Sequence, residues 1–236
     1  MSAKGGSAFG GKKLFVLSLG GSLIVPDKID ADFLKKFRSL ILKQIKKGNC
    51  FIIITGGGKI CRYYQDALRL VTQPTSDDLD WLGIYSTRFN AQLVRLMFKD
   101  YAHPKIVEDT NKKIKFREKI LLAGGWIPGR STDDDAVRLA KAYQANTIIN
   151  LSNIDSVYDR DPKKFKNAKK IKQVSWNDFM KIVGDKWKPG ANLPFDPTAA
   201  KLARKFKLKV IITNGKNLKN LQNILEGKKF QGTVIY

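Results

Sequence analysis

Hydrophobic positions along the chain fall into two patterns. Between residues 30 and 47 the apolar residues recur at intervals of three and four, which is typical of a helix with one buried face. Runs such as FIIIT at 51–55 are apolar at nearly every position, which is typical of strands buried on both faces. We therefore expect strands at 14–19, 51–55, 119–123, 147–151, 209–213 and 233–236, and helices at 30–47, from about 60, and at 80–99, 133–143, 175–183, 196–206 and 218–225.

The alternation of these strands and helices indicates the fold class. Strands that are separated by helices form βαβ units, in which neighbouring strands run parallel. We therefore predict an α/β fold, a three-layer α/β/α sandwich with a mostly parallel central sheet. Because no linker divides the chain, residues 14–236 are expected to form one domain with two functional halves, 14–145 and 146–236. Residues 1–13 are expected to be a flexible basic tail, and the run at 163–172 a basic surface excursion.

The net charge widens the range of partners to consider. Lys and Arg number 44 against 21 Asp and Glu, which gives a formal charge of +23. Such a basic chain is expected to meet an anion, which can be nucleic acid, a membrane surface or a phosphorylated small molecule. The alternative is a lysine-rich surface that is only solvated.

Other residue types exclude several classes of protein. The two cysteines, Cys50 and Cys61, cannot form a disulfide framework, and the single histidine, His103, disfavours a zinc site or a hydrolase triad. No apolar run approaches the roughly 20 residues that span a bilayer, and the start of the chain lacks the apolar region of a secretory signal. We therefore expect a soluble cytoplasmic protein with no membrane partner.

Candidate chemistry lies in four loops, each of which follows an expected strand. The loops cover residues 20–22, 56–59, 124–133 and 152–162. In an open α/β sheet, ligands bind beyond the carboxyl ends of the strands. Glycines let backbone N–H groups converge on phosphate oxygens, and a helix N-terminus adds partial positive charge. The second loop, GGGK, precedes a helix that carries Arg62, which can reach back to the same anion.

Each loop also has a plainer interpretation. Adjacent glycines are common in turns and hinges, and Ser131 or Thr132 can be an N-cap followed by the first-turn acids 133–135. None of the loops has the GxxxxGK[ST] or GxGxxG pattern, and the HRD and DFG triplets are absent. The loops together therefore favour phosphate binding without a P-loop.

The loops and their flanking helices resemble a known family. The segments GGSLIVP (20–26), GGGKICRYY (56–64), DWLGIYSTRFNAQL (80–93), GGWIPGRSTDDDAV (124–137), SNIDSVYDRDPKK (152–164) and DPTAAK (196–201) resemble, in this order, motifs of the amino acid kinase superfamily. The TRFNA and GGGK…R segments are most similar to the archaeal-type UMP kinases (uridylate kinases) within it. The resemblance runs over nearly the whole chain.

The resemblance implies an activity. UMP kinases transfer the γ-phosphate of ATP to UMP, giving UDP and ADP, so residues 14–145 would bind UMP and residues 146–236 would bind ATP. A homo-oligomer, usually a hexamer in this family, is also implied. The alternatives are a superfamily kinase with another phosphorylated acceptor and a non-catalytic nucleotide- or RNA-binding member of the fold. The charge alone also allows weak binding of nucleic acid.

Roles for individual residues follow from the resemblance. Catalytic roles are implied for Arg62, Asp196, Lys201 and Lys59. Contacts with ATP are implied for Ser18, Gly20, Gly21, Ser22, Gly58, Arg62, Ser152, Asn153, Tyr158 and Asp161. Contacts with UMP are implied for Gly57, Asp80, Trp126, Ile127, Pro128, Gly129, Arg130, Ser131 and Thr132.

The nucleophile in this reaction, a UMP phosphate oxygen, is already anionic at pH 7 and needs no general base. Catalysis of phosphoryl transfer consists mainly of positioning and charge neutralisation. Mg²⁺ is the expected cofactor. Because substrate phosphates and water supply most of its ligands, we expect no dedicated set of protein ligands for it.

The chain departs from the family pattern at three places. Ser18 stands where many members have a lysine, so the cation would come from Lys59, Lys201 or Lys13. Ser156 replaces a glycine, which would cost about 1 kcal/mol if its φ is positive. Residues 134 and 135 are acids where apolar residues are usual, and they either face solvent or help to hold Mg²⁺.

Overall fold

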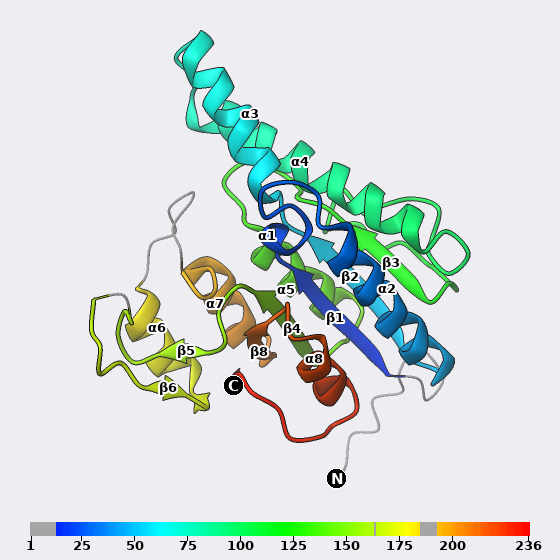
Figure 1. The fold of residues 1–236 in the computed structure, drawn as a ribbon, viewed down its shortest axis with the longest axis vertical. Coiled ribbons are helices and arrows are strands. Elements are labelled where there is room, and N and C mark those ends of the chain that lie inside the picture. Colours follow the sequence, from blue (N-terminus) through cyan, green and yellow to red (C-terminus); the bar gives the residue numbers. More distant parts are fainter. Residues whose placement is uncertain (1–12, 163, 185–192) are drawn as a thin grey trace.

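The computed structural model describes residues 13–162, 164–184 and 193–236. The tail expected at 1–13 therefore lies outside the described residues, apart from Lys13. Within the described ranges, a central sheet has seven strands in the order β3-β2-β1-β4-β8-β9-β7 (Figure 1). Its strands are β1 (Leu14–Leu19), β2 (Cys50–Thr55), β3 (Ile120–Ala123), β4 (Thr147–Ser152), β7 (Gln173–Val174), β8 (Lys209–Asn214) and β9 (Thr233–Ile235).

Parallel pairing dominates this sheet. The pairs β3·β2, β2·β1, β1·β4 and β4·β8 are all parallel, because helices return the chain to the same edge after each strand. β9 alone is antiparallel to its neighbour β8, and it pairs in parallel with β7. The predicted α/β sandwich with a mostly parallel sheet is confirmed.

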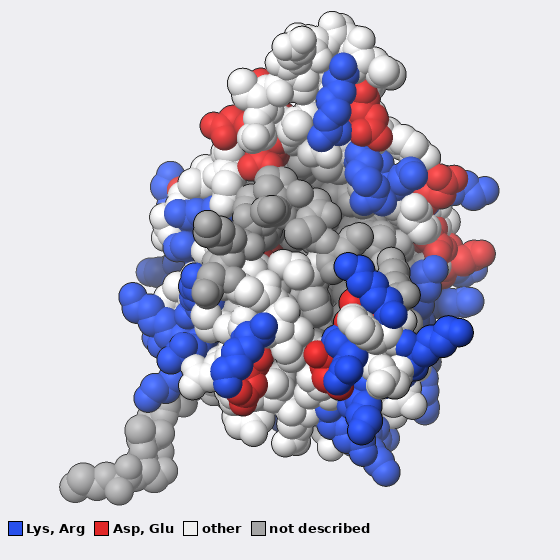
Figure 2. Space-filling view, turned by 90° about the vertical axis from the view of Figure 1, so that its left-hand side faces the viewer, with Lys and Arg blue, Asp and Glu red and all other residues white. Residues whose placement is uncertain are grey.

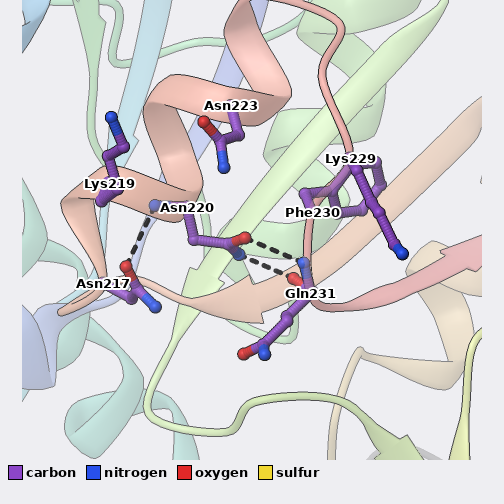
Figure 3. A pocket seen from close by; sticks show the side chains of 7 residues that line it. All are labelled: Asn217, Lys219, Asn220, Asn223, Lys229, Phe230 and Gln231. Atoms are coloured by element: carbon purple, nitrogen blue, oxygen red, sulfur yellow. Dashed lines mark hydrogen bonds between the residues drawn. The ribbon is translucent and has the colours of Figure 1, made fainter.

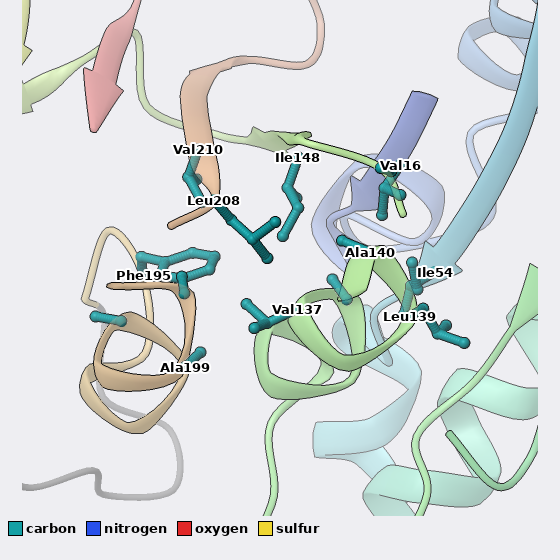
Figure 4. Packing of buried hydrophobic residues seen from close by; sticks show 14 of the residues in the cluster. Val16, Ile54, Val137, Leu139, Ala140, Ile148, Phe195, Ala199, Leu208 and Val210 are labelled. Atoms are coloured by element: carbon teal, nitrogen blue, oxygen red, sulfur yellow. The ribbon is translucent and has the colours of Figure 1, made fainter. Parts of the chain in front are cut away.

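Helices cover both faces of the sheet. On one face α2 packs against β1 through Phe37 and Leu17. On the other face Val137 of α5 and Phe195, next to α7, belong to one buried cluster with Val16 of β1 (Figure 4). No helix in the described ranges combines the length and apolar character needed to cross a bilayer. The helices are α1 (Gly21–Ile24), α2 (Ala31–Lys46), α3 (Gly58–Val71), α4 (Ser76–Met97), α5 (Thr132–Ala142), α6 (Trp176–Val183), α7 (Pro197–Lys205) and α8 (Leu218–Leu225).

Helix boundaries follow capping side chains. Asp30 caps α2 by accepting a hydrogen bond from the backbone N–H of Phe33 at 2.9 Å, as its position in the sequence predicts. The helix expected at 80–99 begins earlier, at Ser76, because Thr75 and Asp78 form a capping box. With this added turn, α3 and α4 form a long helical hairpin that projects from the body (Figure 1).

The elements that the sequence pattern did not predict are very short. They are α1, with four residues, and the two-residue strands β5 (Val157–Tyr158), β6 (Lys170–Ile171) and β7. Such lengths show no hydrophobic period. β6 lies in the basic run at 163–172, whose described residues are exposed or half-buried, and it joins this surface run to β5.

Candidate functional site

The four loops meet at one edge of the sheet. They follow β1, β2, β3 and β4, and because these strands are parallel neighbours their carboxyl ends lie side by side. Backbone hydrogen bonds of 2.9 Å join the first loop to β4, from Gly20 N to Leu151 O, and the second loop to β1, from Gly56 N to Leu19 O. The loops that the sequence singled out are therefore brought together.

The first two loops touch through their glycines. A Cβ atom on Gly21 would lie 2.0 Å from the backbone nitrogen of Gly58, which excludes any side chain there. Gly58 itself has φ of +69°, a conformation that other residues rarely adopt. These glycines therefore let two backbones pack together, a role additional to the phosphate contacts that the sequence predicts.

Asp133, the second residue of α5, lies where β1, β4, α5 and α7 meet. Its carboxylate accepts hydrogen bonds from Asn150 Nδ2 at 3.0 Å, from Ser18 Oγ at 3.4 Å and from the backbone N–H of Asp196 at 3.2 Å. The sequence places Asp133 at the end of the third loop, as a carboxylate at a helix start, without indicating these partners. The missed signal is that Ser18 and Asn150 are polar residues in apolar strands and are register partners across β1 and β4.

Electrostatics single out the same carboxylate. Removal from water raises the pKa of Asp133 to about 7, and the negative charge of Asp196 adds to the rise. Hydrogen bonds from the Asp196 backbone and from Ser18 act in the opposite direction. A buried carboxylate with a raised pKa is stabilised by a nearby cation or hydrogen-bond donor. Such perturbed pKa values are typical of functional sites.

Asp196 has two structural roles. It caps α7, since its Oδ1 accepts from the backbone N–H of Thr198 at 2.6 Å. Its Oδ2 accepts a short hydrogen bond from Ser131 Oγ, which connects α7 to the third loop. Lys201 lies further along α7 with its side chain exposed. Asp196 is thus part of the junction around Asp133 as well as an N-cap.

Helix α4 anchors the second and third loops through residues of the TRFNA segment. Arg88 donates from Nε to Gly125 O and from Nη2 to Trp126 O, both at 3.0 Å. Asn90 Nδ2 donates to Gly56 O at 2.8 Å and to Gly57 O at 3.1 Å. The sequence alone indicates no role for Arg88 or Asn90. Only the fold shows that α4 holds two loops, one through Arg88 and the other through Asn90.

The third loop is organised around Trp126 and Arg130. The Arg130 guanidinium lies 4.3 Å from the centroid of the Trp126 ring, a cation–π contact. Its Nη1 is buried and has no hydrogen-bond partner in the described part of the chain. Asp80 of α4 accepts from Gly129 N at 2.7 Å, so this carboxylate holds the loop. A buried guanidinium nitrogen with unused donors favours an anionic ligand.

The other predicted residues lie in the four loops and in the elements that follow them. Lys59 and Arg62 belong to the first two turns of α3, where Arg62 is exposed and Lys59 Nζ lies 5.4 Å from the Tyr63 ring. At the end of β4, Ser152 Oγ accepts from the N–H of Ile154. Gly57, Ser22, Ile127, Pro128 and Thr132 lie in or beside the first three loops, whereas Asn153, Tyr158 and Asp161 lie in the loop after β4 and in the peripheral β5–β6 sheet.

The three departures from the family pattern have structural outcomes. Ser156 does not have a positive φ, so serine causes no backbone strain there. Asp134 and Asp135 are 2% and 0% exposed, so the expectation that they face solvent is wrong. Asp134 pairs with Arg138, and Asp135 accepts from Thr110 Oγ1 at 3.1 Å.

Lys13 is excluded as the cation near Ser18. It precedes β1, whereas Ser18 is near the carboxyl end of that strand. At about 3.3 Å per residue, the two backbones are roughly 16 Å apart. Of the three candidate cations, only Lys59 and Lys201 belong to helices that begin at the loop edge.

A cavity of about 360 Å³ lies beside α8, which follows β8 (Figure 3). Asn220 donates from Nδ2 to Gln231 O at 2.7 Å and accepts at Oδ1 from Gln231 N at 2.8 Å. These two hydrogen bonds use the polar groups of Asn220 that line the cavity, and they connect α8 to the chain that follows it. We assign it a structural role.

Comparisons with known proteins agree with this geometry. Residues 13–214 match the model of the amino acid kinase family. A uridylate kinase of Thermoplasma volcanium is 36% identical over 90% of this chain and 93% of its own length, and one of Pyrococcus abyssi is 35% identical over 93% and 98%. The crystal structure of the uridylate kinase of Archaeoglobus fulgidus superposes with a TM-score of 0.78 at 29% identity, covering 95% of this chain and all of that chain. The chain therefore belongs to the amino acid kinase family and, within it, to the archaeal-type uridylate kinases.

Proposed function

We propose that this protein is an ATP-dependent UMP kinase that produces UDP and ADP. The observation that carries the proposal is the junction at Asp133, where the third loop meets β1, β4 and α7. It joins the two halves to which the resemblance assigns UMP and ATP. Relatives with 31–36% identity over nearly the whole chain are named uridylate kinases, which supports the same reaction.

The proposed mechanism relies on positioning and charge. Backbone N–H groups of the glycine loops and the N-terminus of α3 face the phosphates, and Arg62 neutralises charge from one turn along that helix. Arg130, whose Nη1 is unpartnered within the described residues, binds the phosphate of UMP. The attacking phosphate oxygen needs no base, so Asp133 positions groups at the junction and accepts no proton from the nucleophile.

Mg²⁺ fits this site as a companion of the nucleotide phosphates. The described residues contain no group of three His, Cys, Asp or Glu side chains that could hold a metal ion. Asp133 would be the residue that holds a phosphate-bound Mg²⁺, directly or through water. When bound, the ion would neutralise charge on the transferred phosphoryl group.

A coupled assay of ADP release tests the proposed activity. We expect UMP to be the preferred acceptor in a panel of AMP, CMP, GMP and UMP with Mg·ATP. A preference for another phosphorylated acceptor would support a different kinase of the family. ATP binding without ADP release on any acceptor would support a non-catalytic nucleotide-binding protein.

We further propose that two copies of the chain associate through the α3–α4 hairpin. No residue of α3 is buried, which is unusual for a helix with a strongly apolar side. Its exposed side chains include Leu70 at 90%, and on α4 Phe89 at 74% and Tyr85 at 61%. A groove of about 750 Å³ between the hairpin and residues 104–108 is lined by several of these residues.

The charge distribution favours a second copy as the occupant. The tip of the hairpin is mostly uncharged, whereas Lys and Arg are spread over the body (Figure 2). Over the whole hairpin, residues 58–97, there are five basic and four acidic residues, so it is nearly neutral in a chain whose net charge is +23. The hairpin is thus a surface on which two copies can meet without strong repulsion.

Substitution of the hairpin surface should separate the copies. We expect Phe89→Asp to lower the molar mass in size-exclusion light scattering to that of the 26.6 kDa chain. Phe165→Asp, which changes a 48% exposed residue away from the hairpin, is the matched control and should leave the mass unchanged. A wild-type mass of one chain at tens of micromolar would contradict the proposal.

A further inference from the structure

A second concave basic site lies at the amino-terminal edge of the sheet, opposite the four loops. It is a cavity of about 330 Å³ between the start of α6, the end of α7, the start of β8 and the end of β9. β9 runs antiparallel to β8, which brings its last residues to the edge where β8 begins. The cavity is lined by Ser175, Trp176, Asn177, Arg204, Lys207, Leu208, Lys209 and Tyr236.

Three of the lining residues carry positive charge. Arg204, Lys207 and Lys209 are exposed, and none forms an ion pair with another residue in the described ranges. Asp178, the acid next to the cavity, is bonded to Ser175 and paired with Lys181. Like charges around one concavity repel each other unless an anion lies between them.

The wall of this cavity is a fixed structure. Trp176 donates from Nε1 to Leu208 O at 3.0 Å and from its backbone N to Tyr236 O at 2.9 Å. These bonds tie α6, β8 and the end of β9 together. The indole is 4% exposed, so the aromatic floor is rigid, whereas the Tyr236 side chain is 60% exposed at the rim. Two of the cations belong to α7 and β8, and Lys207 lies in the turn between these elements, beside this wall.

We propose that this cavity binds a small molecule carrying two or more phosphate groups. Its volume is at the lower end of the range of small-ligand sites. One guanidinium and two ammonium groups can bind several phosphate oxygens at once. A ligand with a single carboxylate has too few oxygens to contact all three cations. The nine residues of α7 separate the cavity from Asp196, a length of about 13 Å, so this ligand is additional to the nucleotides of the proposed reaction.

Tryptophan indole NMR signals can test this site separately from the nucleotide site. The chain has four tryptophans, among which Trp176 reports on the cavity and Trp126 on the third loop. Inorganic tripolyphosphate serves as the probe, and the Trp176 signal is assigned with Trp176→Phe. We expect tripolyphosphate to shift the Trp176 signal of the wild-type protein in a saturable way.

Removal of two cations should weaken this binding about tenfold or more. The double variant Arg204→Gln, Lys207→Gly suits the test because Lys207 has φ of +53°, which glycine adopts without strain. Lys35→Gln, Lys36→Gln on the exposed side of α2 is the control of equal charge and should bind as the wild type does.

Three outcomes would overturn the proposal. They are a Trp176 signal that tripolyphosphate does not move, equal binding by the double variant, and a shift produced by a uridine oligonucleotide but not by tripolyphosphate. Failure of the proposed kinase activity would be seen in ADP release and at Trp126, and it leaves the readout at Trp176 intact.

Discussion

Asp133→Asn is expected to abolish most of the kinase activity and to flatten the dependence of stability on pH. The pKa of Asp133 is raised from 3.8 to about 7 in the folded protein, chiefly by removal from water. A raised pKa means that folding favours the protonated acid. Stability is therefore fully present below about pH 4 and is lost as the pH rises to about 7.

The size of the effect can be bounded. One pKa unit corresponds to about 1.4 kcal/mol, so the ionised Asp133 weakens the fold by up to roughly 4 kcal/mol above pH 7. Asparagine has no charge to desolvate, and its oxygen still accepts from Ser18 and Asn150. The variant should therefore lose less stability than the wild type between pH 4 and pH 8 in urea unfolding.

Activity separates a functional carboxylate from a structural one. Asp133 lies at the junction of the loops that the proposed reaction uses, and we expect its substitution to lower kcat/KM for UMP about 100-fold or more. Asp135→Asn is the matched control, because the pKa of Asp135 is also raised to about 7, chiefly by burial. It should flatten the pH dependence similarly with a smaller loss of activity. A variant of Asp133 with wild-type turnover would exclude the carboxylate from the mechanism.

The sheet could be predicted from the sequence because buried parallel strands are apolar throughout. All five neighbours from β3 to β8 were expected within one residue of their observed bounds. The loops were predicted for a related reason, since polar and glycine-rich segments directly after such strands converge at one edge. Both features are written in local sequence.

Contacts between elements could not be predicted in the same way. Asp133 at the start of α5 looks like any first-turn acid until Ser18 and Asn150 are seen beside it. Arg88 looks like a polar residue of a helix until the third loop lies against it. These roles arise from residue pairs more than 15 positions apart in the sequence. Such contacts leave no pattern in the neighbouring residues from which they could be predicted.

Arg62→Ala is expected to lower kcat/KM for UMP by about 10²–10³, or roughly 3–4 kcal/mol of transition-state stabilisation. Arg62 lies one turn from Gly58 on the same side of α3, so its guanidinium is in reach of an anion bound at the helix N-terminus, as we propose for the nucleotide phosphates. It is exposed and forms no ion pair within the described residues, so its removal should leave the melting temperature nearly unchanged.

Arg69→Ala provides the matched control for this prediction. Arg69 lies two turns further along the same side of α3, about 10 Å from Arg62, where it pairs with Asp66. Its loss should leave kcat/KM within about twofold, whereas Arg62→Lys should restore part of the rate because a charge returns without the bidentate fork. If Arg62→Ala and Arg69→Ala turned over UMP equally well, phosphate neutralisation would have to come from Lys59, Lys201 or Arg130, and the N-terminus of α3 would lose its assigned role.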